Sequence, residues 1–147
     1  MTDQKNTVKG RILALDLGKK RIGLALSDPL GITAQGLETL QRTNIRQDLS
    51  AITQVILQRE VTLLLMGNPL HMSGDAGRQA AYVHEFGERL AQHTGVPLRY
   101  WDERLTTVEA HRVLRSSGIG IEKRAKAIDK LSAVILLESY LDSGAEW

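Results

Sequence analysis

The chain has 147 residues, of which 42% are hydrophobic, 24% charged and 4% aromatic, a size and composition typical of one domain with a packed core. Its 19 basic and 17 acidic side chains give a net charge of +2, which permits an anionic partner without requiring one. The absence of cysteine excludes disulfides, thiolate catalysis and cysteine-held zinc. Any metal would therefore be held mainly by oxygen ligands, which favours Mg²⁺ or Mn²⁺.

Residues 1–10 are polar and predict a flexible tail, followed by a single domain over residues 11–147. The tail lacks the apolar core of a signal peptide, and no apolar run is long enough to span a bilayer. We therefore expect a soluble cytoplasmic protein that has no membrane partner.

Two apolar runs at 11–17 and 21–28 predict strands joined by a hairpin at residues 18–20, where Gly18 tolerates left-handed backbone. Weak alternation over 36–42 predicts a third antiparallel strand. Asn44 is a plausible N-cap for a helix that runs to Arg59, since the apolar residues that follow it have helical spacing.

The second half of the chain alternates strands and helices. Strands are predicted at 61–66 and 96–101, and helices from the glycine-rich loop at 67–77 to Thr94, over 106–118 and over 122–142. The resulting order, β-β-β-α-β-α-β-α-α, predicts an α/β fold in which a mixed sheet has helices on both faces.

Asp16 lies inside the first apolar run, where an unpaired charge would cost several kcal/mol. Such a residue indicates a site for a cation or a reaction, although an Asp can also close a strand by bonding the turn. Asp102 and Glu103 follow the last predicted strand, at an end that borders the crevice in parallel sheets. Strand alternation lets only one of them face the side of Asp16; alternatively, both are solvated and pair with Arg104.

Asp129 lies in the last predicted helix, on a stripe with Ala133, Leu136, Leu137 and Tyr140 that should pack on the sheet. The alternative is an early-helix acid that complements the helix dipole. Three carboxylates brought together would repel one another, and a divalent cation removes that repulsion. The pattern predicts phosphoryl transfer of the two-metal type, in which two cations about 4 Å apart activate water and stabilise the leaving oxygen.

Several basic side chains are placed where they could hold nucleic-acid phosphates. They are Lys19, Lys20 and Arg21 in the hairpin, Arg104 beside the acidic pair, and Lys123, Arg124 and Lys126 at the start of the last helix. A basic helix start is unusual, because the dipole favours acids there, and it indicates a polyanionic partner. A solvated turn is the plainer explanation of the hairpin residues, and Arg104 can simply pair with a neighbouring acid.

Four motifs in chain order carry a resemblance to a known family. They are Leu15-Asp16-Leu17-Gly18-Lys19-Lys20-Arg21-Ile22-Gly23, Gly67-x-Pro69-Leu70-x-Met72-x-Gly74, Asp102-Glu103-Arg104-Leu105-Thr106-Thr107 and Asp129-x-x-Ser132-Ala133-x-x-x-Leu137. On these motifs nearly the whole chain beyond the tail resembles the YqgF (RuvX) family of pre-16S rRNA nucleases or Holliday junction resolvases, in the ribonuclease-H-like superfamily. The resemblance implies a ribonuclease-H-like, five-stranded mixed sheet of order 3-2-1-4-5, with strand 2 antiparallel.

The resemblance also implies a metal site formed by Asp16, Asp129 and an acid of the Asp102–Glu103 pair, with Mg²⁺ or Mn²⁺ as cofactor. It favours Glu103 as the third catalytic residue, because related resolvases have a glutamate there. The chain departs from the family's usual pattern at Lys19, Asn68 and Ser132, where Thr, Leu and Ala are common; none of these is a predicted ligand.

The predicted function is a metal-dependent nuclease that hydrolyses phosphodiesters of structured nucleic acid, in processing the 5′ end of pre-16S rRNA during ribosome biogenesis. One alternative is resolution of four-way DNA junctions, and another is a non-catalytic module for ribosome assembly or nucleic-acid binding. Ribosomal precursor particles are possible partners, and the sequence leaves open a monomer or a homodimer. An actin-like or sugar-kinase ATPase would need two such domains, and this length supplies one.

Overall fold

The computed structural model describes residues 10–68, 75–102 and 121–144, without the side chains of 75–79 and 121–130. The tail before Gly10 and the predicted helix at 106–118 lie outside the described residues, as do positions 69–74 of the glycine-rich loop. The described elements are β1 (Arg11–Leu17), β2 (Arg21–Ser27), β3 (Ala34–Gly36), β4 (Leu40–Gln41), α1 (Ile45–Arg59), β5 (Val61–Asn68), α2 (Asp75–Thr94), β6 (Leu98–Asp102) and α4 (Ile121–Asp142).

The strands form one mixed sheet in the order β3-β2-β1-β5-β6, with β4 pairing with β2 beside that path. β2 is antiparallel to β1, whereas β5 and β6 run parallel to it. This confirms the predicted α/β fold and its order 3-2-1-4-5, with β4 as an additional strand.

The predicted strand at 36–42 is replaced by two short strands. Gly36 pairs with Ala25, and Leu40 pairs with Ile22. The chain therefore advances four residues from β3 to β4 while the partner strand β2 advances only three. The one extra residue breaks the ladder as a bulge does and separates β3 from β4.

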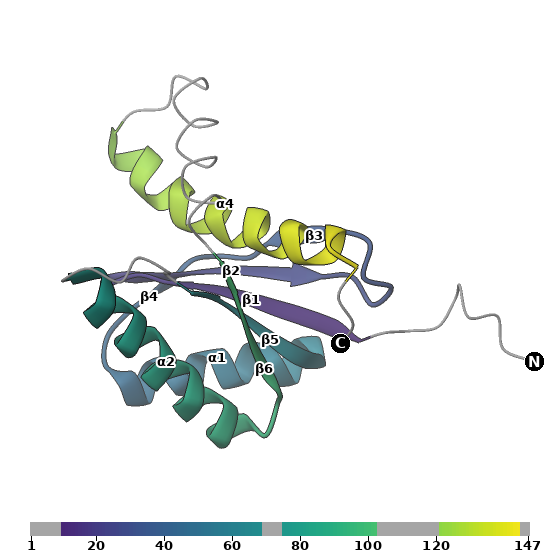
Figure 1. Ribbon diagram of the computed structural model, residues 1–147, viewed down its shortest axis with the longest axis horizontal. Helices are drawn as coiled ribbons and strands as arrows, with labels where there is room; N and C mark the ends of the chain where they lie inside the picture. Colours follow the sequence, from purple (N-terminus) through teal and green to yellow (C-terminus); the bar gives the residue numbers. More distant parts are fainter. Residues whose placement is uncertain (1–9, 69–74, 103–120, 145–147) are drawn as a thin grey trace, which may run out of the picture.

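Helices cover both faces of the sheet, with α1 and α2 on one face and α4 on the other (Figure 1). Along β1, Leu13 and Leu15 pack in the core beneath α1 and α2, while Ile12 and Ala14 pack beneath α4. β1 is thus buried on both faces, as its nearly continuous apolar run requires. No helix in the described part of the chain is long and apolar enough to cross a bilayer.

α1 begins as predicted. The Asn44 side chain caps it by accepting a hydrogen bond from the Gln47 main-chain N–H at 3.0 Å. Leu49, Ile52 and Ile56 are buried on its inner face.

Gly18 is required at the hairpin for a reason other than the one the sequence indicated. Gly18 does not have the positive φ angle of a left-handed backbone. Instead, its N–H donates to the Arg21 carbonyl at 2.9 Å, and a Cβ atom at this position would lie 2.8 Å from that oxygen. A side chain at residue 18 would therefore force the turn open.

Replacing Gly18 with Ala is expected to lower the free energy of unfolding by about 1–3 kcal/mol, the usual cost of overpacking. Urea unfolding of Gly18→Ala beside Lys19→Ala tests this, because Lys19 is exposed in the same turn. Equal stability of both variants would show that the turn adapts without cost.

The inner stripe predicted for the last helix is confirmed in α4. Ala133, Leu136 and Leu137 are fully buried, and Tyr140 is 1% exposed. Ser132 is also buried, and its hydroxyl has no hydrogen-bond partner, unlike the other buried polar side chains of the described residues. Burying an unpaired hydroxyl destabilises the fold.

Ser132→Ala is therefore expected to raise the free energy of unfolding by about 1 kcal/mol. Ser139→Ala is the matched control, since the Ser139 hydroxyl in the same helix accepts a bond from the Trp101 indole at 3.0 Å. Both changes gain the same helix propensity, so the difference between them comes from removing an unpaired hydroxyl in one case and a hydrogen-bonded one in the other. Thermal unfolding in which Ser139→Ala is stabilised as much as Ser132→Ala would contradict this.

Candidate metal and nucleic-acid site

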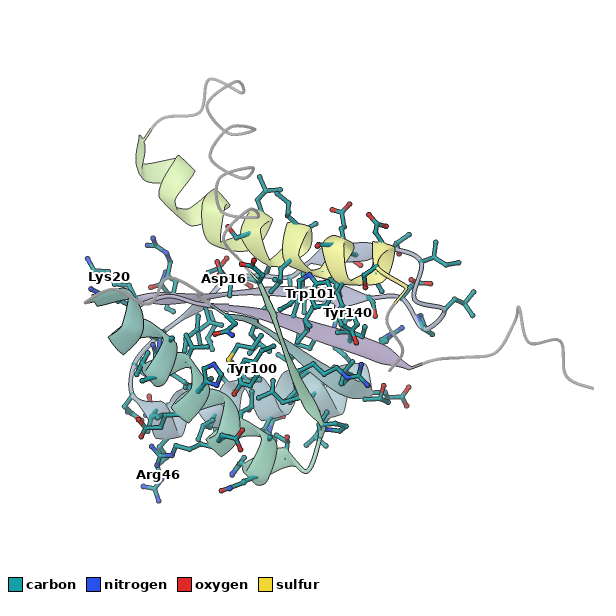
Figure 2. All side chains as sticks on the ribbon, viewed as in Figure 1. Asp16, Lys20, Arg46, Tyr100, Trp101 and Tyr140 are labelled. Atoms are coloured by element: carbon teal, nitrogen blue, oxygen red, sulfur yellow. The ribbon has the colours of Figure 1, made fainter. Side chains whose placement is uncertain are left out.

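Asp16 is held near the carboxyl end of the central strand β1. Leu15 and Leu17 beside it are buried, whereas Asp16 is half-buried. Since Leu15 and Leu17 belong to the core beneath α1 and α2, strand alternation puts Asp16 on the face that α4 covers. Figure 2 shows its side chain on that face.

Glycines flank Asp16 on both neighbouring strands. Gly23 of β2 pairs with it directly. Leu15 pairs with Met66 of β5, so Gly67 lies level with Asp16 on the other side. Because neither glycine carries a side chain, the strands on either side of β1 place no side chain beside the Asp16 carboxylate at this level. A hard oxygen ligand in such a setting fits a hydrated Mg²⁺ or Mn²⁺ ion.

The same row continues to Trp101 of β6, which pairs with Gly67. The Trp101 ring packs edge-on against Tyr140 of α4 at 5.0 Å between centroids. The Tyr140 hydroxyl accepts a hydrogen bond from Arg99 at 3.0 Å. These contacts fix the C-terminal half of α4 across the sheet (Figure 2).

Asp129 lies in α4, one turn before Ala133, on the stripe whose later members are buried. In Figure 1 the first half of α4 and the carboxyl end of β1 lie at the same end of the molecule. The Asp129 side chain is outside the description, so its meeting with Asp16 stays a prediction.

Asp102 is the last residue of β6, and strand alternation decides which face of the sheet it lies on. Tyr100 faces α2, where its ring stacks on His84 at 4.2 Å, and Trp101 faces α4. Asp102 pairs with Asn68 and follows Tyr100 by two residues. Because side chains two residues apart on a strand share a face, Asp102 is assigned to the α2 face, opposite to Asp16. Glu103 and Arg104 lie outside the described residues.

A polar cluster that the sequence did not predict lies on the α2 face. The His84 ring nitrogen Nε2 lies 3.1 Å from Oδ1 of Asn68. Burial, and then the charge of Glu88, raises the pKa of Tyr100, so this phenol stays neutral beneath His84. The departure from the family pattern at Asn68 was the only sequence signal, and the cluster ties the end of β5 to α2.

The predicted phosphate-binding residues are only partly described. Lys19 and Lys20 are exposed at the tip of the hairpin, and Arg21 is half-buried at the start of β2. Lys123, Arg124 and Lys126 lie in the first turns of α4, with their side chains outside the description. The described residues alone contain no cluster of three acidic or histidine side chains that could hold a metal.

Known proteins share both sequence and fold with this chain. A relative from Koribacter versatilis, provisionally named a pre-16S rRNA nuclease, is 50% identical over 95% of this chain and 91% of its own. A relative from Desulforamulus reducens, which has the same name, is 45% identical over 92% of this chain and 99% of its own.

The fold matches those of solved resolvases. RuvC of Thermus thermophilus, solved with a Holliday junction substrate, superposes with a TM-score of 0.59 at 12% identity, over 93% of this chain and 98% of its own. Fowlpox virus resolvase, solved with Holliday junction DNA, gives a TM-score of 0.55 at 10% identity, over 92% of this chain and 99% of its own. The family model of RuvX, described as Holliday junction resolvase, matches residues 10–143. With Asp16 and its glycine neighbours in the matched region, the chain belongs to the RuvX family.

Proposed function

We propose that this protein is a metal-dependent nuclease that hydrolyses phosphodiester bonds of structured nucleic acid, with the 5′ end of pre-16S rRNA as its substrate. The observation that carries the proposal is the placement of Asp16, a half-buried carboxylate near the end of a central strand, level with a glycine on each neighbouring strand. The names of the relatives support the choice of pre-16S rRNA.

Asp16, Glu103 and Asp129 are the proposed ligands of Mg²⁺ or Mn²⁺. Bound there, a pair of such ions would supply an activated water and stabilise the leaving oxygen. Glu103 is preferred to Asp102, because alternation along β6 gives Asp102 the face opposite to Asp16. The chain itself would hold the three carboxylates on a sheet and a helix that are rigidly packed, which keeps their spacing fixed.

The basic residues would hold the backbone of the nucleic acid without reading its sequence. Lys19, Lys20 and Arg21 are at the hairpin that follows Asp16, and Arg104 follows the proposed ligand Glu103. Lys123, Arg124 and Lys126 begin α4, the helix that carries Asp129. The proposed metal ligands therefore have basic residues close to each of them in the chain.

Resolution of Holliday junctions is the second candidate, favoured by the description of the family and by the fold shared with junction-bound resolvases. Paired cutting of a junction needs two sites related by a two-fold axis. A dimer in solution would therefore favour DNA junctions, and a persistent monomer would favour RNA processing.

A panel of substrates tests the proposal. Purified protein is incubated with pre-16S rRNA, a four-way DNA junction and linear RNA and DNA, with Mg²⁺ or Mn²⁺ or with EDTA. We expect cleavage near the 5′ end of the mature 16S sequence that stops in EDTA. Selective cutting of the junction would transfer the proposal to DNA, and no cleavage of either would refute it.

A further inference from the structure

A cleft of about 590 Å³ opens at the tip of the β1–β2 hairpin, on the face of the sheet opposite to Asp16. Its walls come from three parts of the chain: the hairpin, the segment between β4 and α1, and α2. The residues that matter here are Lys19, Lys20, Arg42, Thr43, Asn44 and Tyr82. The volume is in the range of sites for small organic ligands.

Hydrogen bonds hold the walls of this cleft in place. The Arg42 main-chain N–H donates to the Lys20 carbonyl at 2.9 Å, and its guanidinium donates to the Gly18 carbonyl at 2.9 Å. The same guanidinium pairs with Asp48 at 3.2 Å, with side-chain exposures of 9% and 2%. The hairpin tip is thus fixed to the start of α1 before any ligand arrives, which lowers the entropic cost of binding.

The charge of the cleft favours an anion. The Arg42 and Asp48 charges cancel within their buried pair, which leaves the ammonium groups of Lys19 and Lys20 as a charge of +2 at the rim. The Asp48 carboxylate is occupied, since it also accepts from the Thr43 main-chain N–H at 3.1 Å.

An aromatic ring completes the cleft. Tyr82 is half-buried, and the Arg42 guanidinium lies 5.2 Å from the centre of its ring. Two lysines beside an aromatic ring suit a nucleotide, because the lysines neutralise a phosphate and the ring accepts a base by stacking. A purely ionic phosphate site would gain nothing from the ring.

Lys19 is three residues beyond Asp16, so their Cα atoms are at most about 10 Å apart, the span of three residues of extended chain. A nucleic-acid strand that passes around the hairpin tip would therefore reach both sites. Building on the proposed nuclease function, we propose that this cleft binds one nucleotide of the substrate strand, with its phosphate at Lys19 and Lys20 and its base against Tyr82. Figure 2 shows Lys20 at this tip and Arg46 pointing away from it.

Binding of a fluorescent pre-16S rRNA fragment in EDTA, followed by anisotropy at several salt concentrations, tests the proposal. The double variant Lys19→Ala/Lys20→Ala should bind more weakly and reduce the slope of log K against log salt by about 2. The double variant Arg46→Ala/Arg89→Ala removes the same charge from exposed residues that do not line the cleft, and it should change the slope less.

Tyr82 tests the base contact separately. Tyr82→Leu should weaken binding by about 5- to 100-fold, whereas Tyr82→Phe, which keeps the ring, should bind like the wild type. Thermal unfolding of each variant shows whether the fold is intact. If Tyr82→Leu does not fold, the comparison of the two double variants decides.

Equal slopes for the two double variants would overturn the proposal, and wild-type affinity in a folded Tyr82→Leu would do the same. Cleavage by wild-type protein in Mg²⁺ is measured alongside. If the wild type cleaves but the cleft variants bind like their controls, only the proposed nucleotide site is refuted. If the cleft variants bind more weakly but the wild type does not cleave, only the proposed nuclease function is refuted.

Discussion

Asp16→Asn is expected to lower the rate of cleavage by about 10³-fold or more while leaving the affinity for nucleic acid at or above that of the wild type. Losing a charged ligand removes about 4 kcal/mol of transition-state stabilisation, and each 1.36 kcal/mol is tenfold in rate. Affinity is kept because the change removes a negative charge from a surface that faces phosphates. Single-turnover cleavage and anisotropy with the same pre-16S rRNA fragment measure the two effects.

Asp142→Asn is the matched control for this result, since Asp142 is an exposed acid at the far end of α4. It should cleave at the wild-type rate. Full activity of Asp16→Asn in cells and in the cleavage assay would instead support a non-catalytic ribosome-assembly or binding module.

Glu103→Gln is expected to lower the cleavage rate by about 10²- to 10³-fold, the usual cost of losing one group that stabilises transition-state charge. Asp102→Asn should change the rate by only a few-fold, because alternation along β6 gives Asp102 the face of Tyr100 and not that of Asp16. Rates at saturating Mg²⁺ and the Mg²⁺ concentration for half-maximal rate distinguish the two variants.

The opposite ranking, with Asp102→Asn inactive and Glu103→Gln active, would show that the strand twists at its end and presents Asp102 to the metal. Equal and large losses in both would indicate that the pair acts together. Either result would leave Asp16 as a ligand and would change only the identity of its partner.

The sequence predicted the parts of the fold that depend on local patterns. The apolar run around Asp16 predicted a central strand, and the stripe at Ala133 and Tyr140 predicted the inner face of α4, because burial imposes these periods directly. The break between β3 and β4 was not predicted, since one extra residue opposite β2 leaves no trace in the pattern of side chains.

The site was predictable only in part for the same reason. Asp16 is conspicuous as an acid in an apolar strand, but the glycines level with it depend on the register of β2 and β5. The cleft at Tyr82 likewise depends on a long-range contact, the approach of α2 to Arg42. Register and approach are set by tertiary packing, which a single sequence does not display.

The proposed metal site requires that Asp16 of β1, Glu103 after β6 and Asp129 of α4 meet around divalent cations. Crystals grown with Mn²⁺ and measured for anomalous scattering test it most directly. We expect a Mn²⁺ peak at about 2.0–2.3 Å from an Asp16 oxygen, with the Asp129 and Glu103 carboxylates around the same site. An Asp129 carboxylate turned to solvent, or well over about 10 Å from that of Asp16, with no peak at Asp16, would contradict it.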